Sequence, residues 1–296
     1  MKPPTSCHEP GFLSFLTYRK VLSGVKTIMG KAKVIASFTV VLISVGMTFA
    51  GPTNAETIRM AWFAVPPHVT VAEDGVTPQG PTITLFNAIA QKMGCTVDWH
   101  GPLPLNRLGL YQERRQSEID GTILHIKTPA ILPYLYYPKE PYLIGKPSIA
   151  VRVDDPLTSV KTIEDIQGYR IGFVKTFSMS YPAFIKNNLD KVAIDDLTGE
   201  NWTSRNLAKL LSNRLDAVYE RNQYTLGYQA IIDDVEDRIR ILELPVEPIL
   251  HYFVFHKNSD KGKRLLELYE KAVAGMTIDY DGMVRKEMDR LRATRQ

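Results

Sequence analysis

The sequence of 296 residues predicts an α/β fold of two lobes, each a doubly wound and mostly parallel sheet, with two crossing strands as the hinge. Strand-like and helix-like runs alternate as β-α-β-α-β from residue 57, and a similar alternation restarts after residue 153. Extended segments at 148–153 and 246–256 connect the two halves. We therefore expect a first lobe of residues 56–148 and 250–296 and a second lobe of residues 149–249.

The first lobe begins with alternating elements whose ends carry local signals. Its predicted elements are a strand at 57–62, a helix at 82–93, a strand at 96–99, a helix at 105–115 and a strand at 122–126. We expect Thr82 to cap the first helix and Gly94 to end it, because a hydroxyl satisfies early N–H groups and glycine tolerates left-handed backbone. Pro129 ends the last of these strands because it has no N–H. The proline-punctuated stretch 134–142 is predicted to be an aromatic loop.

The second lobe repeats this pattern, and two amphipathic helices close the chain. The predicted strands lie at 148–153, 170–174, 215–219, 239–244 and 250–256, and the predicted helices at 162–166, from 178 toward 189, at 204–211 and at 224–232. The closing helices are predicted at 260–274, with Asp260 as the cap, and at 278–292.

The N-terminal segment carries the pattern of a secretory signal. An uncharged apolar run at 34–50 follows Lys31 and Lys33, and small residues lead to a predicted cleavage after Ala55. Residues 1–55 are therefore assigned to the signal, with Met29 as the expected true initiator. An uncleaved anchor is the alternative, since a run of seventeen residues is near the lower limit for crossing a bilayer.

Charge and cysteine content narrow the class of protein. The formal net charge of +4 comes from residues 1–55, whose balance is +5, so the remainder carries −1 and shows no footprint for nucleic acid. Cys7 lies in the predicted signal and leaves Cys95 alone, so we expect no internal disulfide. The sequence shows no HExxH motif, catalytic-triad order or phosphate-cradling glycine loop, and we expect no metal or cofactor.

Several short motifs occur in a characteristic order along the chain. They are Pro66-Pro67, Gly80, Ile119-Asp120-Gly121, Lys127-Thr128-Pro129, the stretch from Tyr136 to Tyr142, that from Ile163 to Gly168, Gly172-Phe173-Val174, and that from Arg214 to Val218. In order and spacing they resemble the periplasmic solute-binding proteins of polar amino-acid transporters, family 3 of the bacterial solute-binding proteins. The resemblance implies a periplasmic, monomeric, non-enzymatic clamp. It would close on a small molecule and present it to the membrane permease of an ABC transporter.

Two positions depart from the family pattern. Amino-acid binders carry an Arg after the Thr-Pro step to hold the α-carboxylate, and this chain has Ile131 there. They also carry an acid after the second-lobe strand to hold the α-ammonium, and this chain has Arg221, with Glu220 one residue earlier. We therefore expect an acidic ligand, or a ligand held in a different pose.

Candidate ligand-binding residues are those expected near the carboxyl ends of strands and at helix starts. They are Phe63, Arg107, His125, Thr128, Thr176, Ser178, Glu220 and Arg221. Arg107 and Arg221 can each grip a carboxylate with two N–H groups, although either could lie on a solvated surface. Thr176 and Ser178 precede a helix, where N–H groups favour an anion, and Ser178 can also be a plain helix cap.

Alternatives to plain solute binding stay open. His125, Glu220 and His68 could act as acid and base in a dehydratase-like enzyme on the same scaffold. A periplasmic sensor partner of a signalling protein would differ only in what the closed form touches. Structural roles compete as well: Phe63 can be a stacking wall or core, and a lone histidine beside apolar residues is more often a satisfied structural group.

Overall fold

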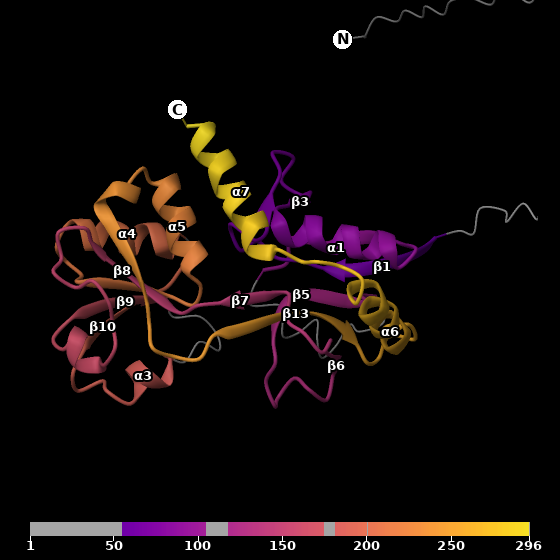
Figure 1. Ribbon diagram of the computed structural model, residues 1–296, viewed down its shortest axis with the longest axis horizontal. Helices are drawn as coiled ribbons and strands as arrows, with labels where there is room; N and C mark the ends of the chain where they lie inside the picture. The colour runs from indigo at the N-terminus through magenta and orange to yellow at the C-terminus, as the bar shows by residue number, and fades with distance from the viewer. Residues whose placement is uncertain (1–54, 105–117, 175–180, 200, 296) are drawn as a thin grey trace, which may run out of the picture. The chain divides into compact units, whose positions relative to one another are not determined.

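The computed structural model describes residues 55–104, 118–174, 181–199 and 201–295, and two main sheets organise them (Figure 1). The first sheet has the order β4 (Cys95–His100), β1 (Glu56–Ala61), β5 (Gly121–Ile126), β13 (Ile249–His256) and β6 (Leu135–Tyr136), with β7 (Leu143–Gly145) also pairing with β13. Strands β4, β1 and β5 are parallel, whereas β13 runs antiparallel to its neighbours.

The second sheet repeats this design. Its order is β10 (Ala193–Leu197), β9 (Arg170–Val174), β11 (Ala217–Glu220), β8 (Ser148–Arg152) and β12 (Ile239–Glu243). Strands β10, β9 and β11 are parallel, and β8 is antiparallel to both β11 and β12. In each sheet the antiparallel strand that breaks the parallel order is one that arrives from the other sheet.

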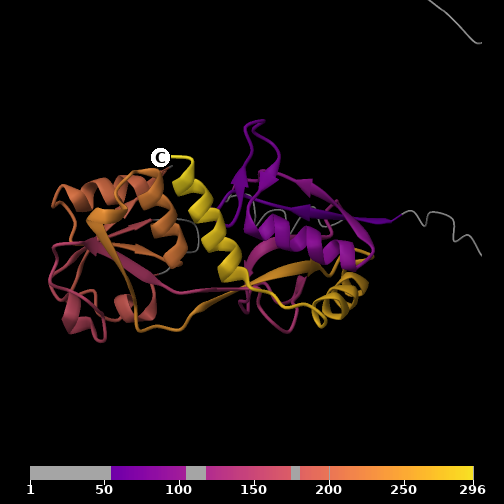
Figure 2. The same ribbon diagram turned by 45° about the horizontal axis from the view of Figure 1, so that its top comes forward.

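Helices cover these sheets in the expected layered manner. Their bounds are α1 (Pro81–Lys92), α3 (Ala183–Lys186), α4 (Trp202–Leu211), α5 (Gln223–Ile232), α6 (Gly262–Val273) and α7 (Tyr280–Ala293), with 3₁₀ turns η2 (Ile163–Ile166) and η3 (Glu236–Arg238) and a small hairpin of β2 (Thr70–Val71) and β3 (Pro78–Gln79). Figures 1 and 2 show α4 and α5 on one face of the second sheet and α3 on the other. Among these described helices, none is both long and apolar enough to cross a membrane.

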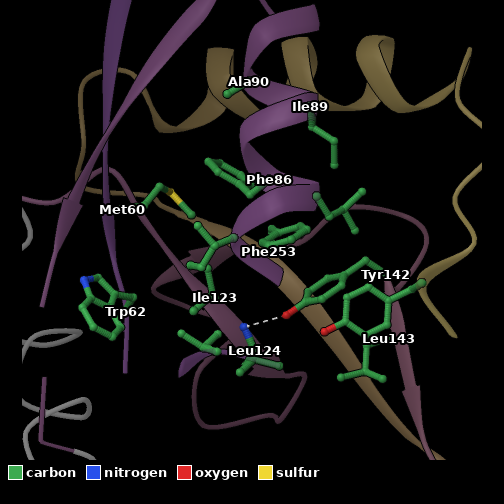
Figure 3. Packing of buried hydrophobic residues seen from close by; sticks show 14 of the residues in the cluster. Met60, Trp62, Phe86, Ile89, Ala90, Ile123, Leu124, Tyr142, Leu143 and Phe253 are labelled. Atoms are coloured by element: carbon green, nitrogen blue, oxygen red, sulfur yellow. Dashed lines mark hydrogen bonds between the residues drawn. The ribbon is translucent and has the colours of Figure 1, made fainter. Parts of the chain in front are cut away.

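The core of the first sheet is aromatic and lies beneath α1 (Figure 3). Phe86 of α1 meets Phe253 of β13 at a ring distance of 4.9 Å, and Tyr142 stacks on the same Phe253 at 3.9 Å. The Tyr142 hydroxyl is buried with them and accepts a hydrogen bond from the Leu124 amide at 3.2 Å. Burying such large rings contributes much of the stabilisation that holds α1 on the sheet.

Some local expectations about helix ends were wrong. Thr82 does not cap α1, because the helix begins at Pro81 after Gly80, and the Thr82 hydroxyl instead contacts the hydroxyl of Tyr280 at 2.7 Å. Gly80 has a φ of +107° and lies so close to the His68 carbonyl that a Cβ would be 2.7 Å from its oxygen, so glycine is required there. Helix α6 begins at Gly262 without a side-chain cap from Asp260.

Other differences concern short elements. The aromatic stretch 134–142 contains strand β6, and the helix predicted toward residue 189 is the four-residue α3. Strand β10 was missed. The predicted signal and the predicted helix at 105–115 lie outside the described residues.

The two crossings between the sheets run side by side. β7 pairs with β13 on the first-sheet side, and β8 pairs with β12 on the second-sheet side. Between them, the Lys146 backbone N–H donates to Oε1 of the Gln223 side chain at 2.8 Å. The Gln223 backbone N–H donates in return to the Lys146 carbonyl at 3.2 Å. The chain therefore passes between the sheets as a paired ribbon attached to the start of α5.

A buried carboxylate at the start of the central strand β5 forms hydrogen bonds to neighbouring segments of the first sheet. Asp120 is fully buried and accepts hydrogen bonds from the Arg59 amide at 2.9 Å, the Arg59 guanidinium at 3.1 Å and the Ser259 hydroxyl at 2.8 Å. Burial alone would raise the pKa of the Asp120 carboxyl, but the hydrogen bonds from Arg59 and Ser259 outweigh it, and the pKa is lowered. Asp120 thus ties β1 to the start of β5 and to the turn after β13.

We predict that Asp120→Asn lowers the free energy of unfolding by roughly 2 to 3 kcal/mol, because it leaves buried donors poorly paired. Since the folded-state pKa is lowered, the carboxylate's contribution is present above the unfolded value of 3.8 and is lost as the pH falls. Urea denaturation at pH 7 measures the change in the free energy of unfolding caused by Asp120→Asn, with Asp98→Asn at an exposed position as the control. A loss at Asp120 no larger than that of the control would contradict this role.

Candidate ligand-binding site

The candidate site lies where loops follow the carboxyl ends of the parallel strands. The loop after β1 carries His68, the step after β5 carries Lys127 and Thr128, and the loop after β11 carries Arg221 and Asn222. In sheets of this kind, ligands bind outside these carboxyl ends. Three predicted site residues lie outside the described residues: Arg107, Thr176 and Ser178.

One hydrogen bond joins the two sheets at this point. The His68 ring, only 1% exposed, has Nδ1 2.8 Å from the Tyr280 hydroxyl and Nε2 2.9 Å from the Asn222 side-chain nitrogen. Asn222 Oδ1 accepts from the Tyr224 amide at 2.9 Å, so its NH₂ group faces His68 and donates to Nε2. The loop after β1 therefore contacts the loop after β11, so loops at the carboxyl ends of parallel strands in the two sheets meet here.

The protonation state of His68 fits this contact. Burial, with a smaller effect of the nearby His251, lowers the pKa of His68 to about 3. The ring is neutral at physiological pH, with its proton on Nδ1, donated to Tyr280. A second proton on Nε2 would face the Asn222 NH₂ group and remove this hydrogen bond.

His251 of β13 adds a second neutral imidazole to the junction. Its Nδ1 lies 3.4 Å from the Leu124 carbonyl, while its buried Nε2 has no hydrogen-bond partner among the described residues. Burial lowers the pKa of His251 to about 4, against the raising effect of Leu124, and the charge of Arg221 lowers it further. A Cβ on Gly145 would lie 3.3 Å from Nε2 and 3.4 Å from the Arg221 carbonyl oxygen, so the His251 ring and the Arg221 backbone both lie next to this glycine.

Glu220 is the most unusual ionisable group of the second sheet. It ends β11, is 8% exposed and accepts a hydrogen bond from the Thr203 hydroxyl at 2.6 Å. Burial raises the pKa of Glu220 to about 7, although the Thr203 hydrogen bond and the Arg221 charge act in the opposite direction. The carboxyl is therefore close to half ionised at neutral pH and can exchange its proton when the local charge changes.

Predicted site residues of the first sheet are more enclosed. His125 is 5% exposed, and its Nδ1 lies 3.3 Å from the Tyr137 hydroxyl; burial lowers its pKa to about 4. Phe63 is 6% exposed and belongs to the aromatic core, which agrees with the core alternative. Its ligand contact stays a prediction, as does that of His125.

The Thr-Pro step forms a turn rather than an extended strand end. The Thr128 carbonyl accepts from the Ile131 amide at 3.1 Å and from the Leu132 amide at 3.2 Å. Ile131 packs, partly buried, against the small cluster of Leu135, Tyr252 and Val254. This apolar environment suits isoleucine and would not suit a charged arginine.

The structure thus gathers part of the predicted site. Arg221 lies near His251, and the next residue, Asn222, contacts His68, whereas the Glu220 carboxylate contacts Thr203. Sequence reasoning missed the contributions of Asn222, Tyr280 and His251. A histidine within the apolar run of β13 and an asparagine before a helix were the available signals.

The described residues contain no cluster of three His, Cys, Asp or Glu side chains that could hold a metal ion. A surface groove of about 370 Å³ occurs between α1 and α6, and none of the predicted site residues lines it. Its lining residues are Lys92, Met93, Leu268, Lys271 and Ala272.

Comparisons with known proteins agree with the fold. No family model matches the sequence, and no curated protein matches it. Among solved structures, an ancestral cationic amino acid solute-binding protein (AncCDT-1) is 20% identical with a TM-score of 0.60, covering 79% of this chain and 95% of that one. Substrate-binding domain 2 of Lactococcus lactis GlnP, in the open conformation, is 18% identical with a TM-score of 0.57, covering 80% and 96%.

A third similar structure is the VFT2 domain of Bordetella pertussis BvgS, a double mutant, which is 17% identical with a TM-score of 0.59 and covers 80% of this chain and 93% of that one. These likenesses confirm the expected two-lobe α/β fold of solute-binding proteins.

We predict that Glu220→Gln changes how stability depends on pH. The folded-state pKa of Glu220, about 7, is above the unfolded value of 4.5, so ionising this carboxyl costs stability as the pH rises from 4.5 through 7. The wild-type protein should therefore lose roughly 3 kcal/mol relative to Glu220→Gln between pH 4 and pH 8. Urea denaturation across this range measures the difference, with exposed Glu267→Gln as the control. A wild-type to variant difference that stays constant with pH would rule out the buried, titrating carboxyl.

Proposed function

We propose that this chain is an extracytoplasmic solute-binding protein that captures a small, polar, anionic metabolite between its two lobes and delivers it to an ABC transporter. In this proposal residues 56–148 and 250–296 form one lobe and residues 149–249 the other. The observation that carries it is the 2.9 Å contact between His68 and Asn222, because it joins loops at the carboxyl ends of parallel strands in the two sheets.

This arrangement suits capture by closure. Each sheet offers loop residues and backbone groups to the same space, and a ligand bound by both would favour the closed arrangement over the open one. The paired crossing strands give the lobes a narrow connection about which they can move. Arg107, Thr176 and Ser178 belong to the same proposed site on sequence grounds.

Charge favours an anionic solute. Lys127, which is exposed, follows β5, and Arg221 follows β11, so each sheet supplies one cation near the proposed site. Protonation of Glu220 near neutral pH removes the charge that would repel a carboxylate. The ancestral neighbour is named for cationic amino acids. The present chain has Ile131 and Arg221 where amino-acid binders of the family hold a zwitterion, and this supports a different ligand.

A periplasmic sensor partner of a signalling protein is the second candidate. The similarity to the BvgS VFT2 domain favours it in part, since the same clamp could present its closed form to another protein. Co-purification from membranes tests the two. Recovery of a permease supports the transporter role, and recovery of a signalling protein supports the sensor role. Enzymatic turnover of a bound acid would instead favour the dehydratase-like alternative.

We predict that calorimetry on the purified protein, screened with dicarboxylates, keto acids and amino acids, finds a carboxylate ligand. Arg221→Ala should weaken its binding by at least tenfold, because a buried charge-assisted pair contributes about 1.5 to 3 kcal/mol. Exposed Arg214→Ala, in the turn before β11, is the matched control and should leave affinity unchanged.

The pH dependence of that affinity gives an independent check. Affinity for an anion should fall between pH 6 and pH 8, as Glu220 ionises with its pKa of about 7. Tight binding of a cationic amino acid, with affinity that rises over the same range, would overturn the anionic proposal.

A further inference from the structure

Helix α7 contacts elements of both sheets. Its first half belongs to the core of the first sheet. Tyr280 is 4% exposed, its hydroxyl contacts Thr82 at 2.7 Å and His68 at 2.8 Å, and Val284 is fully buried in the same core. Figures 1 and 2 both show α7 between α1 and α5, in agreement with its contacts to these two helices. The helix is therefore anchored in the first lobe by buried groups.

The second half of α7 reaches the second lobe. The Arg292 guanidinium donates to both carboxylate oxygens of Glu236 in η3, with Nη2 2.7 Å from Oε1 and Nε 3.0 Å from Oε2. Arg295 Nη1 donates to the Ile231 carbonyl at the end of α5 at 2.7 Å. Gly227 of α5 lets Met288 approach, because a Cβ there would be 2.8 Å from the Met288 methyl group. We call the contacts of Glu236, Ile231, Arg292 and Arg295 the α7 clasp.

The two halves of α7 differ in how easily they could separate from their partners. Releasing Tyr280 and Val284 would expose buried apolar surface and leave His68 Nδ1 without its partner. Within the clasp the Arg292–Glu236 pair is half exposed, with side chains 40% and 42% accessible, so water can replace its hydrogen bonds, whereas Ile231 is 4% exposed. Opening of the lobes would therefore break the clasp before it broke the anchor.

We propose that α7 is a strap fixed in the first lobe, whose clasp on the second lobe sets the balance between closed and open arrangements before any solute binds. This inference rests on the proposed two-lobe clamp and is independent of the identity of the ligand. The clasp lies on η3 and the end of α5, away from the loops after β5 and β11, so it acts on affinity without touching the solute. Weakening it favours the open arrangement and lowers apparent affinity for every ligand by the same factor.

The test measures the lobe separation directly, without a ligand. Spin labels are placed at exposed Gln91→Cys on α1 and Lys186→Cys on α3, in a Cys95→Ser background, and their distance distribution is recorded by electron resonance. Glu236→Gln keeps the side chain's size but removes the second-lobe charged partner of Arg292, which keeps its pair with Asp289 of α7 at 2.6 Å. We expect it to raise the open-to-closed population ratio by roughly two- to fivefold, the range expected for an exposed ion pair. High salt should have the same effect on the wild type and little effect on the variant.

The matched control is Glu287→Gln, which breaks the ion pair with Arg290, a contact that stays within α7. A distance distribution that is the same for Glu236→Gln and Glu287→Gln overturns the strap. So does a single, salt-independent distance in all variants. The distance measurement uses no solute. Failure to find a ligand would therefore count against the proposed function, but the measured lobe separation would still test the strap.

Discussion

The contact of His68 with Asn222 is the constraint on which the proposed site depends. It joins the loop after β1 to the loop after β11, and it forms because several local features place the two side chains together. Gly80 lets α1 start against the His68 carbonyl, and Tyr280 fixes the other ring nitrogen. Asn222 is both the cap of α5 and the donor to His68. One buried imidazole thus couples the loop after β1, the last helix and the loop after β11.

Desolvation gives this junction its electrostatic character. Burial lowers the pKa of His68, His125 and His251 to between about 3 and about 4, so all three rings are neutral hydrogen-bonding groups at physiological pH. The same cause raises the pKa of Glu220 to about 7. Charged groups beside Glu220, Arg221 above all, therefore lie in a less polar medium than water. In such a medium the electrostatic attraction between a charged side chain and a solute of opposite charge is stronger.

Much of the fold followed from periodic patterns, and the exceptions have physical causes. The apolar spacing of 82–93 predicted α1 within a residue at each end, and the run at 250–256 predicted β13. β10 was missed because Asp195 and Asp196 interrupt its apolar pattern. Lys209 of α4 pairs with Asp195 at 2.8 Å, so a tertiary contact stabilises a strand that could not be predicted from its own residues. The cap predicted at Thr82 failed because its hydroxyl is used by Tyr280, almost two hundred residues away along the chain.

The candidate site also contains some residues that could be predicted from the sequence and others whose roles depend on tertiary contacts. Glu220 and Arg221 could be proposed from the sequence because they stand at the end of a recognisable strand. Asn222, His251 and Tyr280 could not, since their roles exist only when distant segments meet. The Thr-Pro step is a turn, and Ile131 after it is packed in an apolar cluster, while ligand contact at Thr128 stays a prediction.

The most direct test of the central claim is a crystal structure of the protein with the ligand found in the metabolite screen, compared with its unliganded form. The account predicts density for the solute between the two sheets, touching Arg221 from one side and the turn at Lys127 and Thr128 from the other, with the lobes closer together than in the free protein. A solute bound on an outer surface, or bound with no change in the separation of the sheets, would contradict it.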